Sequence, residues 1–284
     1  MIALAGTSCT KESPSPPASP AVSTDVLFLG HKGSGNNAYN ENLLENTIPS
    51  LLNALSSLDG VEIDVQMSKD GTLWIWHDDD LYRSCDGENP SFFITRTDAE
   101  IAAYRICHGS KQDRIYSLSE WLDFWKSPQG GFTMSLDVKS YFPSDTFQLV
   151  GGKDAYMKAM AQGLAQLIGT NAPLNAKLLI EVDYRPFITT FKQFSNYPAT
   201  FCLLNEESFE TRVQWAKEKG YDGISINYTN PTVSASGIAQ ARADGLFVQL
   251  YTPYYASELK AAFALNPDAI QTDNVDAKAV LNVY

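Results

Sequence analysis

Residues 61–77 read Val-Glu-Ile-Asp-Val-Gln-Met-Ser-Lys-Asp-Gly-Thr-Leu-Trp-Ile-Trp-His. The stretch begins with an apolar run typical of a strand buried on both faces, interrupted by Glu62 and Asp64. Lys69-Asp70-Gly71 has the composition of a turn, and a second apolar run, Thr72–His77, follows at once. Because a helical crossover needs a dozen or more residues, these two strands must be antiparallel.

The length of the turn sets which side chains of this hairpin face each other. If Lys69-Asp70 is a two-residue loop, counting back along both strands places Glu62 opposite His77. Side chains alternate between the two faces of a strand, so Glu62, Asp64 and His77 would then share one face. A longer or bulged turn would shift this register by one residue.

Outward from the hairpin, short apolar runs alternate with helical patterns. We predict eight barrel strands: Val26–Gly30, Val61–Gln66, Thr133–Val138, Leu178–Val182, Thr200–Leu204, Gly223–Asn227, Phe247–Tyr251 and Ala269–Thr272. We predict helices at Ile48–Leu58, Asp154–Ile168, Pro186–Phe194, Phe209–Lys219, Ser234–Ala243 and Ser257–Leu265, with Ser257 as an N-cap and Gly220 and Gly245 as helix ends. This alternation predicts an α/β fold, a (β/α)8 TIM barrel with an extra hairpin strand after its second strand; a doubly wound sheet is the alternative.

The segment from Ser84 to Ser117 interrupts the alternation and predicts a small insertion at the barrel rim, with one helix near Ala99–Tyr104. Cys85 and Cys107 lie in this region, and an oxidising compartment would allow them to pair. With Cys202 as a third cysteine, at least one thiol stays free.

Composition and charge limit the classes of function. The chain has 284 residues, 44% of them hydrophobic and 19% charged, with a formal net charge of −12, which suits one large globular domain over residues 25–284. Nucleic acids and anionic membranes require a basic face that this composition does not provide. Phosphate chemistry would require a local positive centre, either a metal or a specific Lys or Arg.

The N-terminal segment has the composition of a targeting signal and a linker rather than of a folded domain. Residues 1–9 are apolar or small and end in Cys9, and residues 10–24 are rich in Ser and Pro. We expect a lipoprotein signal remnant with a lipid anchor on Cys9, a semi-rigid tether, and a place in the bacterial cell envelope or periplasm. The alternative is a disordered tail with an incidental cysteine. No apolar run of about 18 or more residues occurs.

Two histidines and two carboxylates point to catalysis. His31 and His77 each follow a predicted strand, where barrel active sites form. Glu62 and Asp64 stand inside an apolar strand, where carboxylates are unfavourable unless they are paired or bound to a metal. Two carboxylates that share one face suit a hard divalent cation such as Ca²⁺ or Mg²⁺.

Five short motifs, in this order and spacing, resemble those of the glycerophosphodiester phosphodiesterase family. The family pattern is HRG, ENT, ExDV, KDG and HDxxLxR; the chain has His31-Lys32-Gly33, Glu45-Asn46-Thr47, Glu62-x-Asp64-Val65, Lys69-Asp70-Gly71 and His77-Asp78-x-x-Leu81-x-Arg83. Weaker similarity continues at Ile115–Leu122, Asp137-Val138-Lys139 and Thr272-Asp273.

The resemblance implies a barrel that cleaves small glycerophosphodiesters to an alcohol and glycerol 3-phosphate, acting as a monomer. It implies a divalent metal held by Glu62, Asp64 and Asp137, and an acid–base pair of His31 and His77. Which histidine is the acid stays open, and so do the oligomeric state and whether water or the glycerol hydroxyl attacks. Two alternatives remain: a related phosphodiesterase or phospholipase with a different leaving group, and a barrel that binds phosphodiesters without catalysis.

Three departures from the family pattern concern the substrate. Lys32 replaces an Arg, and we expect it to contact phosphate as a point charge, together with Lys139. Asp137 replaces a Glu that is one methylene longer. Tyr251 stands where the family tends to place a Trp near the substrate.

Further residues are predicted to support the site. Glu45 would position His31 or touch the metal, unless it is only an acid in the first turn of a helix. Asp78 would orient His77 or cap the loop. Glu181 and Asp183 form another Glu-x-Asp at the fourth predicted strand, although Asp183 could instead cap a helix, and Asp273 ends the last strand. For Lys139 the alternative role is a partner of Asp137. We expect His108 to be structural or on the surface.

Overall fold

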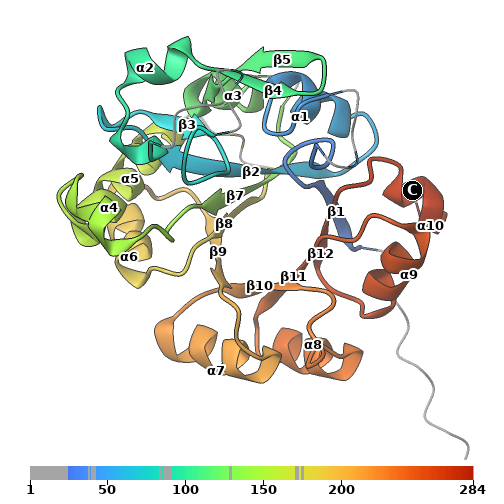
Figure 1. Cartoon of the computed structure of the whole chain (residues 1–284). Coiled ribbons are helices and arrows are strands. Elements are labelled where there is room, and N and C mark those ends of the chain that lie inside the picture. Colours follow the sequence, from blue (N-terminus) through green and yellow to red (C-terminus); the bar gives the residue numbers. More distant parts are fainter. Residues whose placement is uncertain are drawn as a thin grey trace, which may run out of the picture.

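Eight parallel strands form a closed barrel in the computed structural model, which describes residues 25–37, 39, 43–82, 85, 91–127, 130–169, 173 and 176–283. The barrel strands are β1 (Leu27–Gly30), β2 (Gly60–Met67), β7 (Thr133–Val138), β8 (Leu178–Glu181), β9 (Ala199–Leu204), β10 (Gly223–Asn227), β11 (Phe247–Tyr251) and β12 (Ala269–Thr272). β1 pairs with both β12 and β2, which closes the ring (Figure 1). The predicted TIM barrel is confirmed, and each predicted strand agrees with the observed one to within a residue at either end.

Helices surround the strands (Figure 1). They are α1 (Ile48–Ala54), α2 (Asp98–Ala103), α3 (Leu118–Trp125), α4 (Ser144–Gln148), α5 (Lys153–Ile168), α6 (Arg185–Phe194), α7 (Phe209–Lys219), α8 (Ala235–Ala243), α9 (Ala256–Ala264) and α10 (Ala277–Leu281). Their apolar faces pack on the strands and form one large buried core. The six predicted helices are present and a helix lies at the predicted rim position, whereas α3, α4 and α10 were not predicted.

Helix ends were predicted less accurately than helix positions. Gly220, in the left-handed conformation, closes α7 as expected. Ser257 is not the N-cap of α9: Tyr255 is, and the Glu258 carboxylate accepts its backbone N–H. The predicted helix from Ile48 is too long, because α1 ends at Ala54.

The hairpin after β2 is antiparallel as predicted, but the predicted register of its two strands is wrong by one residue. Val65 pairs with Ile75 of β3 (Leu73–Ile75), so Glu62 does not lie opposite His77. The turn contains three residues rather than two, because Gly71 adopts a positive φ of 92° that extends the loop. His77 lies beyond the end of β3, where strand alternation no longer decides its direction.

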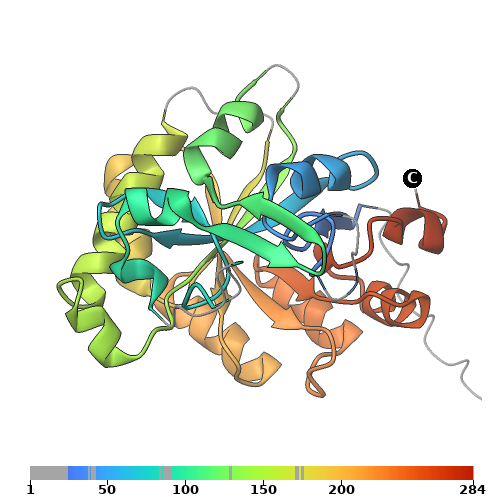
Figure 2. The same ribbon diagram turned by 45° about the horizontal axis from the view of Figure 1, so that its top comes forward.

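The predicted rim insertion is present and has its own small core. The strands β4 (Arg105–His108) and β5 (Lys111–Arg114) form a hairpin that lies at the barrel rim in Figure 1 and in front of the barrel in the tilted view of Figure 2. β6 (Tyr116–Ser117) pairs with β3. Buried aromatic and aliphatic side chains hold this layer together, among them Trp74, Trp76 and Phe93. His108 is exposed on β4, as expected for a surface residue.

A disulfide bond joins Cys85 to Cys107 on β4, and Cys202 is a buried free thiol. The disulfide fixes the segment after His77 to the rim hairpin. The predicted anchor on Cys9, the tether up to residue 24 and the motif residue Arg83 lie outside the described residues. Within the described part of the chain, no helix is both long enough and apolar enough to cross a bilayer.

We expect removal of this disulfide to destabilise the fold. Closing a loop of this length restricts the unfolded chain and stabilises by about 3 kcal/mol, so the double substitution Cys85→Ser with Cys107→Ser should lower Tm by roughly 6 to 12 °C. Thermal unfolding with and without reductant measures this effect. Reductant should lower the Tm of the wild type but not of the double variant; an unchanged wild-type Tm would contradict a stabilising role.

Candidate active site

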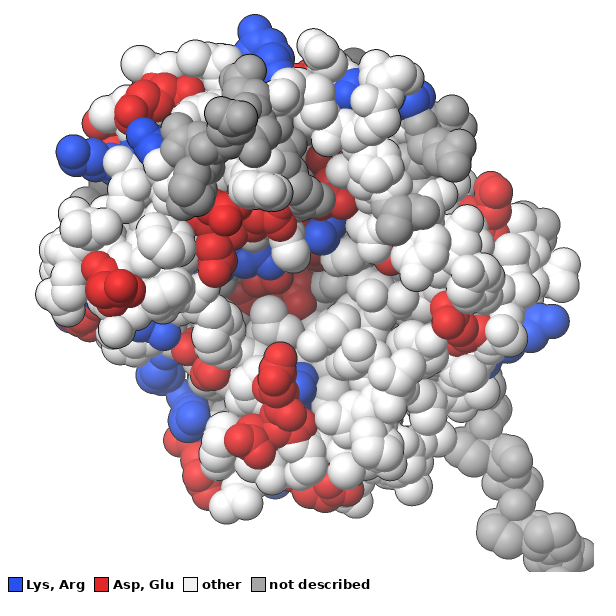
Figure 3. Space-filling model, in the orientation of Figure 1, with Lys and Arg blue, Asp and Glu red and all other residues white. Residues whose placement is uncertain are grey.

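A cleft of about 900 Å³ opens at the carboxyl ends of the barrel strands. Figure 3 shows it as a hollow at the centre of this face, with acidic and basic side chains together inside it. Most of the predicted site residues line this cleft: His31, Lys32, Glu62, His77, Asp137, Lys139, Glu181 and Tyr251. This is the face on which (β/α)8 barrels carry their catalytic residues.

Three carboxylates meet at the base of the cleft. The parallel pairing of β2 with β7 places Asp64 beside Asp137, and Glu62 lies two residues earlier on the same face of β2. One oxygen of each of the three carboxylates lies within 4.8 Å of the others. The predicted ligands are thus brought together, although the register that linked Glu62 to His77 was wrong.

Burial and neighbouring charges shift the pKa values of the two β2 carboxylates in opposite directions. Burial, followed by repulsion from Asp64 and Glu181, raises the pKa of Glu62 well above its usual range. Burial alone would also raise the pKa of Asp64, but Lys139 and His77 hold that pKa well below its ordinary value. Within the cluster, the nearby cations therefore favour the charged form of Asp64, whereas burial and repulsion disfavour the charged form of Glu62.

Lys139 supplies the positive charge at the cluster. Its ammonium group lies 2.6 Å from Asp64 Oδ1 and 2.6 Å from Asp137 Oδ2. Despite burial, these two carboxylates raise the pKa of Lys139, so it stays charged. Lys139 therefore has both features considered from the sequence: it pairs with Asp137, and it lines the cleft.

Asn46 fixes Asp64 in place, a role that the sequence analysis missed. Its side-chain amide donates to Asp64 Oδ2 at 2.6 Å, and its Oδ1 accepts the Asp64 backbone N–H at 3.3 Å. Asn46 has a φ of 57°, a left-handed conformation that Asn tolerates better than most residues. Its place in Glu45-Asn46-Thr47 was the available signal.

Each of the two histidines is held by an aspartate. His31 Nδ1 lies 2.7 Å from Asp273 Oδ1, and His77 Nδ1 lies 2.7 Å from Asp78 Oδ1. A carboxylate accepts hydrogen bonds, so in both rings Nδ1 carries the proton and Nε2 remains for other chemistry. His31 Nε2 faces the cluster, 3.9 Å from Glu62 Oε2.

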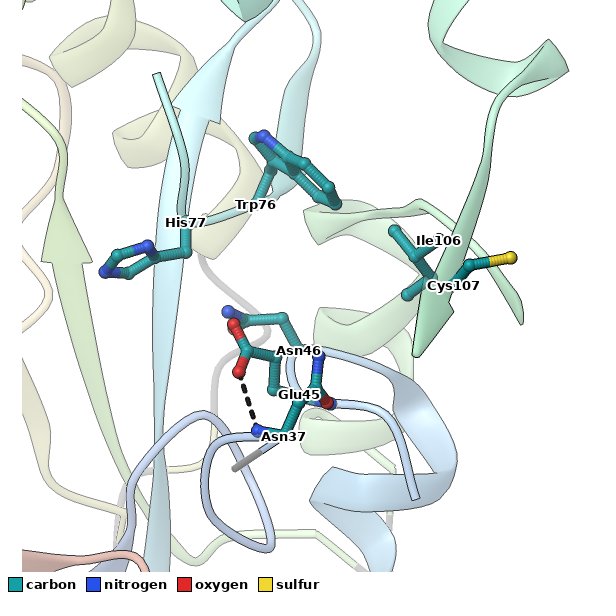
Figure 4. A pocket seen from close by; sticks show the side chains of 7 residues that line it. All are labelled: Asn37, Glu45, Asn46, Trp76, His77, Ile106 and Cys107. Atoms are coloured by element: carbon teal, nitrogen blue, oxygen red, sulfur yellow. Dashed lines mark hydrogen bonds between the residues drawn. The ribbon is translucent and has the colours of Figure 1, made fainter. Parts of the chain in front are cut away.

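The loop after β1 connects His31 to the carboxylates. The Lys32 backbone N–H donates to Glu62 Oε2 at 2.9 Å, and the Lys32 ammonium lies 3.5 Å from Glu45 Oε1. Glu45 also accepts the Asn37 backbone N–H at 2.9 Å, as Figure 4 shows. Glu45 therefore holds the Lys32 side chain and the loop that begins at His31.

A small recess separates this loop from the rim insertion (Figure 4). His77 and Trp76 point to opposite sides of their strand extension there, Trp76 toward the rim core and His77 away from it. The change of direction after β3 therefore lets His77 line the cleft while Trp76 is buried.

The cleft wall that continues from Asp137 onto β8 and the later strands is polar and aromatic. Burial and the nearby Asp137 raise the pKa of Glu181 to about 7, and Glu181 accepts hydrogen bonds from Ser135 and Gln271. Tyr251 lines this wall, with the buried Arg212 against its hydroxyl. Tyr141, Arg212 and Trp215 were not predicted, because only the packing of distant elements brings them to the site.

The donor set of the cluster fits a hard divalent cation. Its ligands are carboxylate oxygens alone, two of the three residues are buried, and their mutual repulsion is only partly offset by Lys139. Oxygen-rich sites of this type suit Ca²⁺ and Mg²⁺ better than softer metals.

The fold and the site together define a class of protein. It is a (β/α)8 barrel with a carboxylate cluster suited to a metal ion, and with two histidines, at the carboxyl ends of its strands. Comparison with known sequences identifies the family. The profile of the glycerophosphoryl diester phosphodiesterase family matches residues 31–277. The chain belongs to this family.

A relative with a similar sequence supports this family assignment. A glycerophosphodiester phosphodiesterase from Caldanaerobacter subterraneus subsp. tengcongensis is 38% identical over 121 residues, 40% of this chain and 46% of the relative. The aligned segment thus spans less than half the length of that relative.

Solved structures show the same fold. A glycerophosphoryl diester phosphodiesterase family structure from Silicibacter pomeroyi has a TM-score of 0.73 and 18% identity, with 93% of this chain and 94% of that chain covered. A phosphodiesterase from Oleispira antarctica, solved with the product sn-glycerol-3-phosphate, has a TM-score of 0.71 and 19% identity, with 90% and 96% covered.

We expect Asn46→Gly to weaken cation binding, because Asp64 loses the amide that orients it. Glycine accepts the positive φ, so the substitution removes the side chain without straining the backbone. Loss of such an orienting contact typically reduces metal affinity about 10- to 100-fold. Calorimetric titration with Ca²⁺ and with Mg²⁺ measures the change. Asn266→Gly, at another positive-φ position far along the chain, is the matched control. Equal affinities in Asn46→Gly and the wild type would contradict the role.

Proposed function

We propose that this protein hydrolyses glycerophosphodiesters to an alcohol and glycerol 3-phosphate. The observation that carries the proposal is one cleft that contains a three-carboxylate cluster, two Asp-held histidines and a lysine, on the barrel of a phosphodiesterase family. The glycerol 3-phosphate bound in the Oleispira antarctica relative supports the same product.

The two histidines would move the protons of the reaction. Cleavage of a phosphodiester requires a proton to leave the attacking oxygen and another to reach the departing alkoxide. His31 and His77 each keep Nε2 for this exchange, while Asp273 and Asp78 hold the rings and stabilise them when protonated. One histidine accepts a proton while the other donates one, so the pair is ready for another cycle after proton exchange with water.

Glu62, Asp64 and Asp137 would hold the cation, with Ca²⁺ and Mg²⁺ as the proposed ions. Such an ion, when bound, offsets the negative charge that develops on the phosphate oxygens. Asn46 and Lys139 keep the carboxylates in position through their hydrogen bonds.

Lys32 and Lys139 are the proposed phosphate contacts from the protein. Both line the cleft, and Lys139 is held charged by two carboxylates. A lysine ammonium binds phosphate as a point charge, whereas arginine would form two parallel hydrogen bonds. We therefore propose that Lys32 attracts the phosphate group of the substrate, and that the cation site and the two histidines orient that group. The cell-envelope location and the Cys9 anchor remain proposals from the sequence.

The direct test is release of glycerol 3-phosphate by the purified chain. We expect hydrolysis of at least one of glycerophosphocholine, glycerophosphoethanolamine and glycerophosphoinositol with Ca²⁺ or Mg²⁺, and its loss with a chelator. His31→Ala and His77→Ala should each lower kcat by about 10²- to 10⁴-fold while cation binding is kept, because only proton transfer is removed. Enzymatic assay of the product and phosphorus NMR give the rate and the identity of the product.

Lys158→Ala, an exposed change far from the cleft, is the control and should leave kcat unchanged. Absence of glycerol 3-phosphate from all three substrates under both cations would reject the proposed reaction. A cyclic or other phosphate product would instead indicate a related phosphodiesterase. Retained binding of a phosphodiester with no turnover would indicate a barrel that only binds.

A further inference from the structure

A second hollow adjoins the catalytic cleft at the carboxyl end of β7. It measures about 450 Å³ and is lined by Ser140, Tyr141, Phe142, Pro143, Ser144, Phe147, Gln148 and Lys153; we call it the α4 groove. Tyr141 lines both the groove and the cleft, and the groove begins one residue after Lys139. The groove and the cleft are therefore adjacent, with Tyr141 forming part of the wall of each.

The walls of the α4 groove are apolar and preformed. Phe142 packs edge to face on Phe147, with ring centroids 5.4 Å apart, and both rings pack on the buried Tyr156. Tyr141 is fixed by its hydroxyl, which donates to Asp183 Oδ2 at 2.8 Å and lies 3.0 Å from the Leu204 carbonyl oxygen. These contacts hold the ring between the groove and the cleft, and an apolar chain lying there would need little rearrangement.

A buried hydroxyl at this groove has no partner. Ser140 is 0% exposed, and its Oγ forms no hydrogen bond within the described part of the chain. Buried polar groups are nearly always hydrogen-bonded, so an unpaired one calls for an explanation. A polar group of a bound molecule beside Ser140 would supply the missing partner.

Lys153 brings a positive charge without an anion to pair with it. Its ammonium lies over three rings, 5.6 Å from Tyr141, 5.7 Å from Phe147 and 5.1 Å from Tyr184, and no described carboxylate forms an ion pair with it. Burial lowers its pKa, which the charge of Asp183 only partly offsets.

Helix stability does not explain this lysine. Lys153 is the first residue of α5, where the positive end of the helix disfavours a cation. Lys158, farther along the same helix, instead pairs with Asp154 at 2.7 Å. The three rings stabilise the Lys153 ammonium by cation–π contacts, and an anion in the groove would add the ion pair that Lys153 lacks among the described carboxylates.

We propose that the α4 groove binds the leaving alcohol of the substrate, and that it selects alcohols with an apolar chain that carries an anionic group. The inference rests on the proposed phosphodiesterase function. The glycerol portion is small and polar, so only the leaving alcohol provides an apolar chain for Phe142 and Phe147. The anionic group pairs with Lys153, and Ser140 hydrogen-bonds to a polar atom of the chain.

The rest of the cleft does not favour an anion. Glu206 and Glu207 also line the cleft, and the chain has a net charge of −12. Such charges act over a distance and are screened beyond about 8 Å at physiological salt. Selection for an anionic leaving group therefore depends on short-range contact with Lys153 and not on the field of the whole protein.

Two matched series of substrates test the proposal. One consists of glycerol 3-phosphate esters of ω-hydroxy carboxylic acids of increasing chain length, and the other of the corresponding neutral amides. The wild type should show a lower KM for the acids than for the amides once the chain is long enough to reach the groove, by about tenfold. Lys153→Met should abolish that advantage and leave the amides unchanged, whereas Lys153→Arg should retain most of it. Lys158→Met, on the same helix, is the control and should behave like the wild type.

Glycerophosphoethanolamine serves as the reference in every variant. Its hydrolysis shows that the enzyme is folded and that the proposed function holds, so failure of that function is distinguished from failure of the groove. Equal KM values for acids and amides at every chain length, with the reference still hydrolysed, would overturn the proposal. An equal loss for acids and amides in Lys153→Met would also overturn it, because it would show a purely structural role for Lys153.

Discussion

Repulsion among Glu62, Asp64 and Asp137 is the constraint on which the rest of the site depends. Three acidic side chains meet at the ends of β2 and β7, where burial removes the water that would screen them. Lys139, the residue after β7, offsets part of this negative charge, and the remaining negative charge suits a hard cation. The barrel makes the arrangement possible, since eight stiff strands keep the carboxylates from moving apart.

The neighbouring residues make sense as supports of this cluster. Asn46 fixes Asp64, the Lys32 backbone fixes Glu62, and Glu45 holds the loop that carries Lys32. The same loop carries His31. Asp273, the residue after the last barrel strand β12, holds the His31 ring through a hydrogen bond to Nδ1. Proton transfer and charge compensation are therefore positioned by one connected set of hydrogen bonds.

Much of this was predictable from the sequence, for physical reasons that differ among the parts. Buried strands are recognisable as short apolar runs. The ordered motifs pointed to His31, His77, Glu62 and Asp64, and a weaker match pointed to Asp137; the fold brings these residues to one cleft. The hairpin register was not predictable, because it depends on the positive φ of Gly71, which lengthens the turn by one residue. The partners of Asn46, Arg212 and Lys153 depend on how distant elements pack, and no local pattern contains that information.

The central claim is that phosphodiester cleavage depends on a cation held by the three carboxylates. The most direct measurement is the rate of glycerol 3-phosphate release against free Mg²⁺ or Ca²⁺ for the wild type, Asp137→Asn and Asp137→Glu. We predict saturable dependence on the cation in the wild type, retention of that dependence with glutamate, and its loss or a shift to much higher concentrations with asparagine. A rate that is independent of the cation, or an asparagine variant that matches the wild type, would contradict the account.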